Sequence, residues 1–216
     1  MRRMNGLRRL LLLGTAATLA APALASSRRA LVTMTDGPFY PPSAWRAAWA
    51  DQDADLSRVQ RGGQVLQARG EHLGLELTLV DTAGRVLDGA EIEIWQCDAL
   101  AAYRHPRVPA APGSFDEGFQ GFGATRSNAR GMARLRTIRP VPYPGRTPHI
   151  HVKLRHASFG ELGSQLFVAG DPGNARDFLW RAVAPQDRAG LELPLQAATA
   201  DSGLRWAARH TLVLPA

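Results

Sequence analysis

The chain has 216 residues, 45% of them hydrophobic, which suits one globular domain and excludes a disordered protein. Its formal net charge is +7, but the four arginines of residues 1–25 account for four of these charges, so the remainder carries about +3. The basic side chains are scattered among acidic ones and form no stripe, which argues against a nucleic-acid partner. Cys97 is the only cysteine, so no internal disulfide can stabilise the fold.

Residues 1–25 are typical of an export signal. Arg8 and Arg9 precede an apolar run from Leu10 to Ala21, and Ala23-Leu24-Ala25 supplies the small residues of a cleavage site. The run is too short for a membrane span, so we expect no membrane association once the signal is removed. The paired arginines favour the twin-arginine route over the general secretory one. The sequence therefore predicts a periplasmic or extracellular protein.

Residues 26–70 show no regular pattern. The run from Asp36 to Pro42 contains three prolines, which exclude a helix or a central strand there. Within Ser43–Arg61 the sequence allows a short helical turn. We expect an extended arm that lies across the domain formed by residues 71–216.

Apolar and polar residues begin to alternate at Leu73, with the period of a half-buried strand. Segments that share this pattern are residues 73–79, 90–97, 132–138, 149–154, 165–168 and 210–214. Residues 98–123 form a loop too long to be a simple connection, and residues 125–131 are predicted to be a turn. Helical potential is confined to about residues 175–183. Short strands separated by turns predict an all-β fold, a β-sandwich with long loops and little helix.

A pair of histidines provides the first chemical signal. His149 and His151 are one residue apart in a strand pattern, so their side chains share a face and can reach one metal ion. Such pairs also occur as surface or hydrogen-bonded histidines. Two of the three tyrosines, Tyr103 and Tyr143, lie in loops beside the strongest strands, and Tyr143 belongs to a stiff proline-rich loop just before the histidines.

The available side chains favour ferric iron over other metals. A ferric ion is a hard cation that suits phenolate oxygens, and imidazole is also a suitable ligand. Zinc is more usually held by cysteine, histidine and carboxylate. A non-haem ferrous site of the two-histidine type needs a carboxylate, and residues 149–151 contain none.

Several segments resemble the intradiol ring-cleavage dioxygenases, and within them the protocatechuate 3,4-dioxygenase type. They are residues 37–40, 90–98, 103–105, 137–140, 143–151, 165–167 and 170–172, and the likeness spans about residues 33–173. Two positions depart from the family pattern: Asp36 stands where glutamate is commoner, and Val141 where glycine is usual. Both departures concern the substrate and not the metal.

The resemblance implies a β-sandwich that holds mononuclear non-haem Fe(III). The iron ligands that it implies are Tyr103, Tyr143, His149 and His151. The residues that it implies as catalytic are Arg146, Tyr143 and Gln165. Those that would line the substrate pocket are Gly37, Pro38 and Tyr40.

The resemblance also implies the reaction: O₂ opens a protocatechuate-like catechol ring between its two hydroxyl-bearing carbons and gives a cis,cis-muconate-type diacid. The expected partners are thus a small catechol and O₂, and homo-oligomerisation is left open. Two alternatives remain, a non-catalytic β-sandwich binding module and a zinc- or copper-dependent hydrolase that uses the histidine pair.

Overall fold

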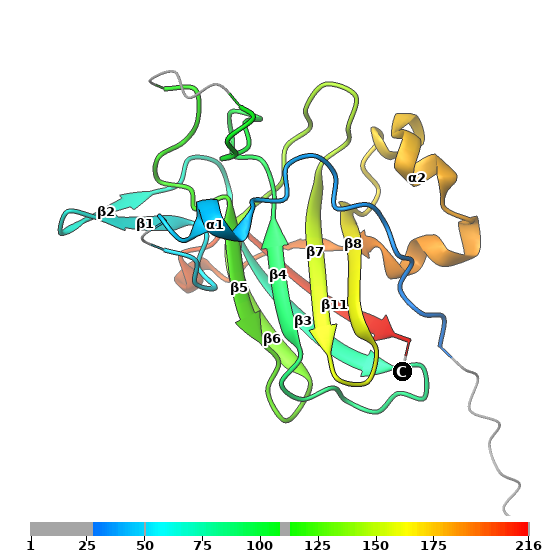
Figure 1. Cartoon of the computed structure of the whole chain (residues 1–216). Coiled ribbons are helices and arrows are strands. Elements are labelled where there is room, and N and C mark those ends of the chain that lie inside the picture. The colour runs from blue at the N-terminus through cyan, green and yellow to red at the C-terminus, as the bar shows by residue number, and fades with distance from the viewer. Residues whose placement is uncertain (1–27, 50, 109–112, 216) are drawn as a thin grey trace, which may run out of the picture.

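Two β-sheets packed face to face form the body of the protein (Figure 1). The structure is a computed structural model that describes residues 28–49, 51–108 and 113–215. The four-stranded sheet has the order β10-β11-β3-β6, with strands at Leu195–Ala197, Trp206–Leu214, His72–Asp81 and Met132–Ile138. The five-stranded sheet has the order β5-β4-β7-β8-β9, with strands at Phe122–Arg126, Glu91–Trp95, His149–His156, Gly160–Val168 and Glu192–Leu193. The predicted signal, residues 1–25, lies outside the described residues.

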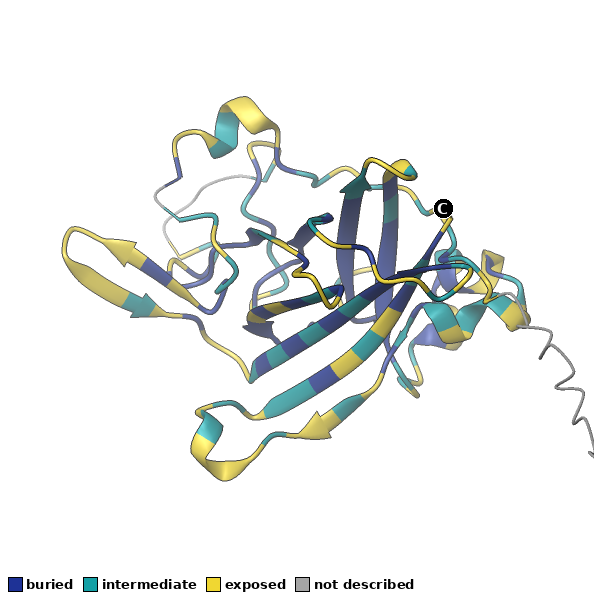
Figure 2. Ribbon diagram, turned by 90° about the horizontal axis from the view of Figure 1, so that it is seen from below, coloured by how far each residue is buried: buried dark blue, intermediate teal, exposed yellow. Residues whose placement is uncertain are grey.

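The core lies between these sheets and follows the predicted alternation. Leu73, Leu75, Leu77 and Leu79 of β3 are all buried and belong to one apolar cluster with the isoleucines of β4. Burial of these alternating side chains drives the two sheets together. Figure 2 shows buried residues concentrated in the stacked strands and exposed residues in a projecting hairpin. The predicted all-β sandwich with little helix is confirmed.

Strand β7 is buried on both faces. Ile150, Val152 and Leu154 belong to the core cluster, so His149 and His151 must point to the opposite, outer face of the five-stranded sheet. The N-terminal arm covers this outer face and crosses β7 and β8 in Figure 1. One backbone hydrogen bond fastens it there, from Met34 N to Gly163 O at 2.8 Å.

Strands β1, β2 and β5 escaped the sequence pattern, and so did the short strands β9 and β10. The hairpin of β1 (Arg58–Arg61) and β2 (Gln64–Gln67) lies within the segment predicted as an extended arm, which also contains the short helix α1 (Ser43–Arg46). Strand β5 occupies the end of the predicted loop and part of the predicted turn. Its Gly123 packs so closely on Leu56 that an added Cβ would stand 2.3 Å from Leu56 Cδ1. A side chain at Gly123 would not fit, and pairing with β4 holds β5 in the sheet.

The helical segments are short and lie mostly after β8. They are η1 (Asn174–Arg176), α2 (Phe178–Ala182), η2 (Pro185–Gly190) and η3 (Ala200–Ser202). The first two fall within or beside the predicted helical region. Across the described part of the chain, no helix has both the length and the apolar character needed to cross a membrane.

Candidate metal and substrate site

Four aromatic side chains gather on the outer face of the five-stranded sheet. His149 and His151, at the start of β7, have ring centroids 4.9 Å apart. The Tyr143 ring lies 5.5 Å from that of His149, and the Tyr103 ring lies 6.2 Å from that of His151. The two tyrosine rings meet edge to face at 5.6 Å. The structure thus brings together all four predicted ligands, which we call the ring cluster.

Three buried polar atoms of the ring cluster have no hydrogen-bond partner: Tyr103 Oη, His149 Nε2 and His151 Nδ1. Buried polar atoms are normally paired, so this concentration needs an explanation. His149 Nδ1 lies 2.6 Å from the carbonyl oxygen of Thr147, which can only accept, so Nδ1 carries the proton. The lone pair of Nε2 is then directed into the cluster, as a metal-binding histidine requires.

Burial sets the protonation of the ring cluster. It lowers the pKa of His149 to about 4 and that of His151 well below its usual value, so both imidazoles are neutral at pH 7. Burial also raises the pKa of Tyr103 well above its usual value, and it raises the pKa of Tyr143, which the nearby Arg146 charge opposes. Both phenols stay protonated unless a cation compensates their negative charge.

The surroundings of the histidines offer few other metal ligands. Among the described residues there is no group of three or more histidine, cysteine, aspartate or glutamate side chains suited to a metal. A metal held by His149 and His151 would therefore draw on the phenol oxygens of Tyr103 and Tyr143. This donor set fits ferric iron better than zinc.

Trp95 orients one of the histidines. It pairs with His151 across β4 and β7, and the indole stacks on the imidazole with centroids 4.7 Å apart and planes 11° from parallel. The Trp95 side chain is fully buried, so this contact restricts rotation of the His151 ring.

Arg146 is held beside the ring cluster by three polar contacts. Its Nε donates to Asp177 Oδ2 at 2.8 Å, and its Nη2 donates to Gln165 Oε1 at 2.6 Å. The third contact, from Nη1 to the Tyr143 hydroxyl, is longer at 3.5 Å. Gln165 lies opposite His151 across β7 and β8. The predicted catalytic residues Arg146, Tyr143 and Gln165 therefore form one connected group.

Asp177 completes this group, and sequence reasoning missed it. Its fully buried carboxylate accepts from the backbone N–H groups of Leu179 and Trp180, which caps helix α2. It also accepts from Thr147 N at 3.0 Å, beside the Arg146 contact. An aspartate just before a predicted helix indicates a cap, but nothing in the sequence pairs it with an arginine 31 positions earlier.

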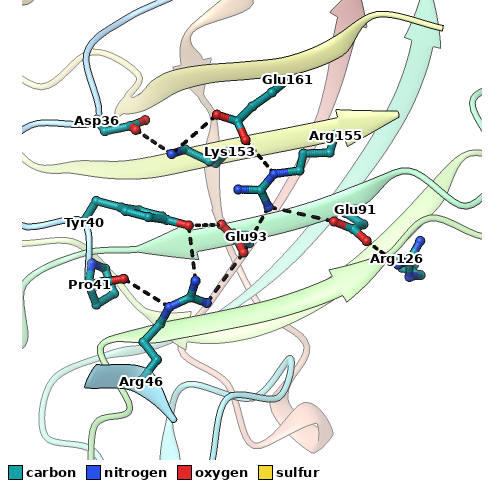
Figure 3. A network of polar contacts seen from close by, with 10 residues as sticks. All are labelled: Asp36, Tyr40, Pro41, Arg46, Glu91, Glu93, Arg126, Lys153, Arg155 and Glu161. Atoms are coloured by element: carbon teal, nitrogen blue, oxygen red, sulfur yellow. Dashed lines mark hydrogen bonds and ion pairs between the residues drawn. The ribbon is translucent and has the colours of Figure 1, made fainter. Parts of the chain in front are cut away.

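The three residues predicted to line the pocket have different surroundings. Gly37 lies against His151, since an added Cβ would stand 3.4 Å from its Cε1 atom. Pro38 is exposed. The hydroxyl of Tyr40 donates to Glu93 Oε2 at 2.8 Å, so it belongs to a network of charged groups beside the ring cluster (Figure 3).

A cavity of about 630 Å³ opens beside the ring cluster. Tyr143 and Arg146 form part of its wall, together with neighbouring loop residues and residues 171–173, 176 and 177. This volume is within the range of small-molecule sites. Tyr143 therefore borders both the cavity and the buried histidines.

A family model and several known proteins match this chain in sequence. The family model described as "Dioxygenase" matches residues 35–209. The chain is 30% identical over 148 residues to the protocatechuate 3,4-dioxygenase beta chain of Burkholderia cepacia, covering 64% of this chain and 61% of that protein. It is 31% identical over 137 residues to the hydroxyquinol 1,2-dioxygenase of Corynebacterium glutamicum, covering 55% and 43%. The chain thus matches less than two thirds of the length of these relatives.

Solved structures show the same fold. The dioxygenase domain of a dioxygenase and carbohydrate-binding fusion protein from Streptomyces sp. SirexAA-E superposes with a TM-score of 0.63 at 26% identity, covering 87% of this chain and 99% of that one. An intradiol ring-cleavage dioxygenase from Tetranychus urticae superposes with a TM-score of 0.62 at 18% identity, covering 87% and 95%. The second likeness concerns the fold alone.

Proposed function

This chain belongs to the intradiol dioxygenase family, and from that premise we propose that it opens catechol-type rings with O₂ at a mononuclear ferric ion. The ligands would be Tyr103, Tyr143, His149 and His151. The observation that supports this most directly is the set of three buried ring-cluster atoms without hydrogen-bond partners. The product would be a cis,cis-muconate-type diacid, because the ring opens between its hydroxyl-bearing carbons.

When bound, the ferric ion would supply a Lewis-acid centre that holds the substrate oxygens. The protein supplies the proton chemistry. Tyr143 borders the cavity, so its oxygen, as the phenolate that a bound ferric ion would favour, would be placed to take a proton from a substrate hydroxyl. The buried histidines are neutral and face away from bulk water, which suits ligands that stay in place.

Arg146 supplies a fixed positive charge. Its guanidinium is always charged, and Asp177 and Gln165 hold it in one orientation at the cavity wall. In this position it can stabilise the negative charge that develops on the ring during the reaction with O₂. Gln165 accepts the Arg146 hydrogen bond and so acts on the substrate through Arg146.

Colour tests the ligand set. Phenolate-to-ferric charge transfer should make the iron-loaded protein red to brown. Tyr103→Phe should weaken or shift the visible band and lower the iron content, measured by absorption spectroscopy and metal analysis. Tyr40→Phe is the matched control. It should leave the visible band unchanged, because the Tyr40 hydroxyl bonds Glu93. A colourless protein with stoichiometric iron would rule out tyrosinate ligation.

Substrate preference tests the choice of a protocatechuate-like catechol. Arg176 lies in the cavity wall and, among the residues that the structure describes, has no ion-pair partner, so it can bind a substrate carboxylate. Steady-state assays should give protocatechuate the highest kcat/KM among protocatechuate, catechol and hydroxyquinol. Arg176→Gln should reduce that preference over catechol by about tenfold. A strong preference of the wild-type enzyme for unsubstituted catechol would overturn this choice.

A further inference from the structure

A short stretch of the N-terminal arm lies against the ring cluster and Gln165. Alternate residues of this stretch, residues 35–39, each touch a different site residue. The Gln165 amide donates to the Thr35 carbonyl at 2.9 Å, Gly37 lies against His151, and the Phe39 ring stacks on Tyr103 with centroids 4.6 Å apart. The position of this stretch therefore affects the space above the ring cluster.

The only lysine of the chain lies beneath this stretch (Figure 3). Lys153 is on the same face of β7 as His151, and its side chain is 7% exposed. Its ammonium lies 2.5 Å from Asp36 Oδ2, 3.8 Å from Glu161 Oε1 and 3.8 Å from the centre of the Tyr40 ring. A charge this buried needs such partners, and the arm provides Asp36 and Tyr40.

The end of the stretch is fastened to β4. Glu93 accepts from the Tyr40 hydroxyl at 2.8 Å and lies 3.6 Å from Arg46 Nη1, both in the N-terminal segment. On the sheet side, Arg155 Nη1 lies 3.1 Å from the same carboxylate. Ionic contacts therefore hold the arm on both sides of Gly37 and Phe39.

Strand β8 contains a notch that fits the arm. Gly163 lies opposite Lys153 in the β7–β8 ladder. A Cβ added to Gly163 would stand 2.6 Å from Asp36 Oδ1 and 3.3 Å from the Met34 carbonyl oxygen. A side chain at this position would thus push Asp36 away from the lysine.

We propose that Lys153, Asp36 and Gly163 form a latch that fixes residues 35–39 over the ring cluster, where the catechol would bind, which makes Lys153 a positioning residue for substrate binding. This inference rests on the proposed function for its effect on catalysis. Its effect on the arm follows from the contacts alone, because the notch and the ion pair act on Asp36, next to Gly37.

Three variants test the latch: Lys153→Met removes the charge, Asp36→Asn removes its arm partner, and Gly163→Ala fills the notch. Each should speed amide hydrogen exchange in residues 33–40 by about tenfold. Each should also raise KM for the catechol substrate by about tenfold, with kcat changed less than about threefold. Iron content should stay near the wild-type level, because both histidines lie on β7 and neither tyrosine ligand belongs to the arm.

Lys153→Arg should restore most of the wild-type exchange and KM, since it keeps the charge. The double variant of Lys153→Met and Asp36→Asn should be no worse than the worse single one, because both changes break the same pair. Arg134→Met is the matched control, because it removes a 2.8 Å ion pair with Glu76 on the other sheet. It should behave as the wild type.

Wild-type exchange and KM in both Lys153→Met and Asp36→Asn would overturn the latch. Should Lys153→Met fail to fold, Asp36→Asn decides, because its side chain is 36% exposed and lies in the arm. A wild-type protein that opens no catechol would instead overturn the proposed function, while hydrogen exchange would still test the latch.

Discussion

His149→Ala should remove iron binding and, with it, ring cleavage. The imidazole is buried, and the Thr147 carbonyl directs its free lone pair into the ring cluster. Losing a group that merely orients a ligand costs about 10- to 100-fold in metal affinity, so losing the ligand itself should cost more. We expect iron content below about a tenth of the wild-type level and a fall in kcat of roughly a thousandfold. Metal analysis and steady-state kinetics measure both.

A second histidine provides the control. His210 is partly buried in the four-stranded sheet, where its Nε2 lies 2.8 Å from the Gly190 carbonyl oxygen. His210→Ala should cost some stability but keep iron, colour and turnover. The metal assignment would be wrong if His149→Ala retained stoichiometric iron and normal turnover.

Arg146→Lys should separate the chemistry from the metal. Lysine keeps the positive charge but lacks the planar fork that bonds Asp177, Gln165 and Tyr143 at once. A fixed donor for developing negative charge is worth ~3 kcal/mol, so kcat should fall by roughly a hundredfold. Iron content, colour and the spectral change on substrate binding should stay as in the wild type, because Arg146 contributes no metal ligand.

The matched control is Arg126→Lys, which alters an exposed ion pair with Glu91 on the same sheet. It should leave kcat within about twofold, as surface pairs contribute little. If Arg146→Lys instead lost its iron while turnover per remaining iron stayed normal, Arg146 would be a structural support of the site.

The sequence predicted the strands and the side-chain directions that local periodicity determines. The alternation in β3 and β7 identified the core strands, and the spacing of His149 and His151 placed two imidazoles on one face. Tyr103 and Tyr143 needed the family resemblance, because no periodicity brings two loops to one sheet. The structure places both beside the histidines. Their role as ligands stays a prediction.

Contacts between distant segments could not be predicted. Asp177 reaches Arg146, and Asp36 reaches Lys153, across separations that leave no pattern in the chain. Strand β5 was missed because Phe122–Arg126 shows no apolar–polar alternation, and its place in the sheet comes from pairing with β4. The hydrogen bond from Tyr40 to Glu93 likewise left no pattern, and the assignment of Tyr40 to the pocket stays a prediction.

The pairing of β11 with β3 affects how the molecule can be synthesised. These strands run parallel and side by side, with Trp206 opposite Leu73 and Leu214 opposite Asp81. Strand β3 therefore cannot complete its pairing until β11 has been synthesised. Contacts of such high sequence separation make folding slow. A chain still emerging from the ribosome contains every residue of the ring cluster but lacks a central strand of the opposite sheet. The sandwich can therefore close only after β11 has left the ribosome, and until then the nascent chain carries an incomplete apolar face.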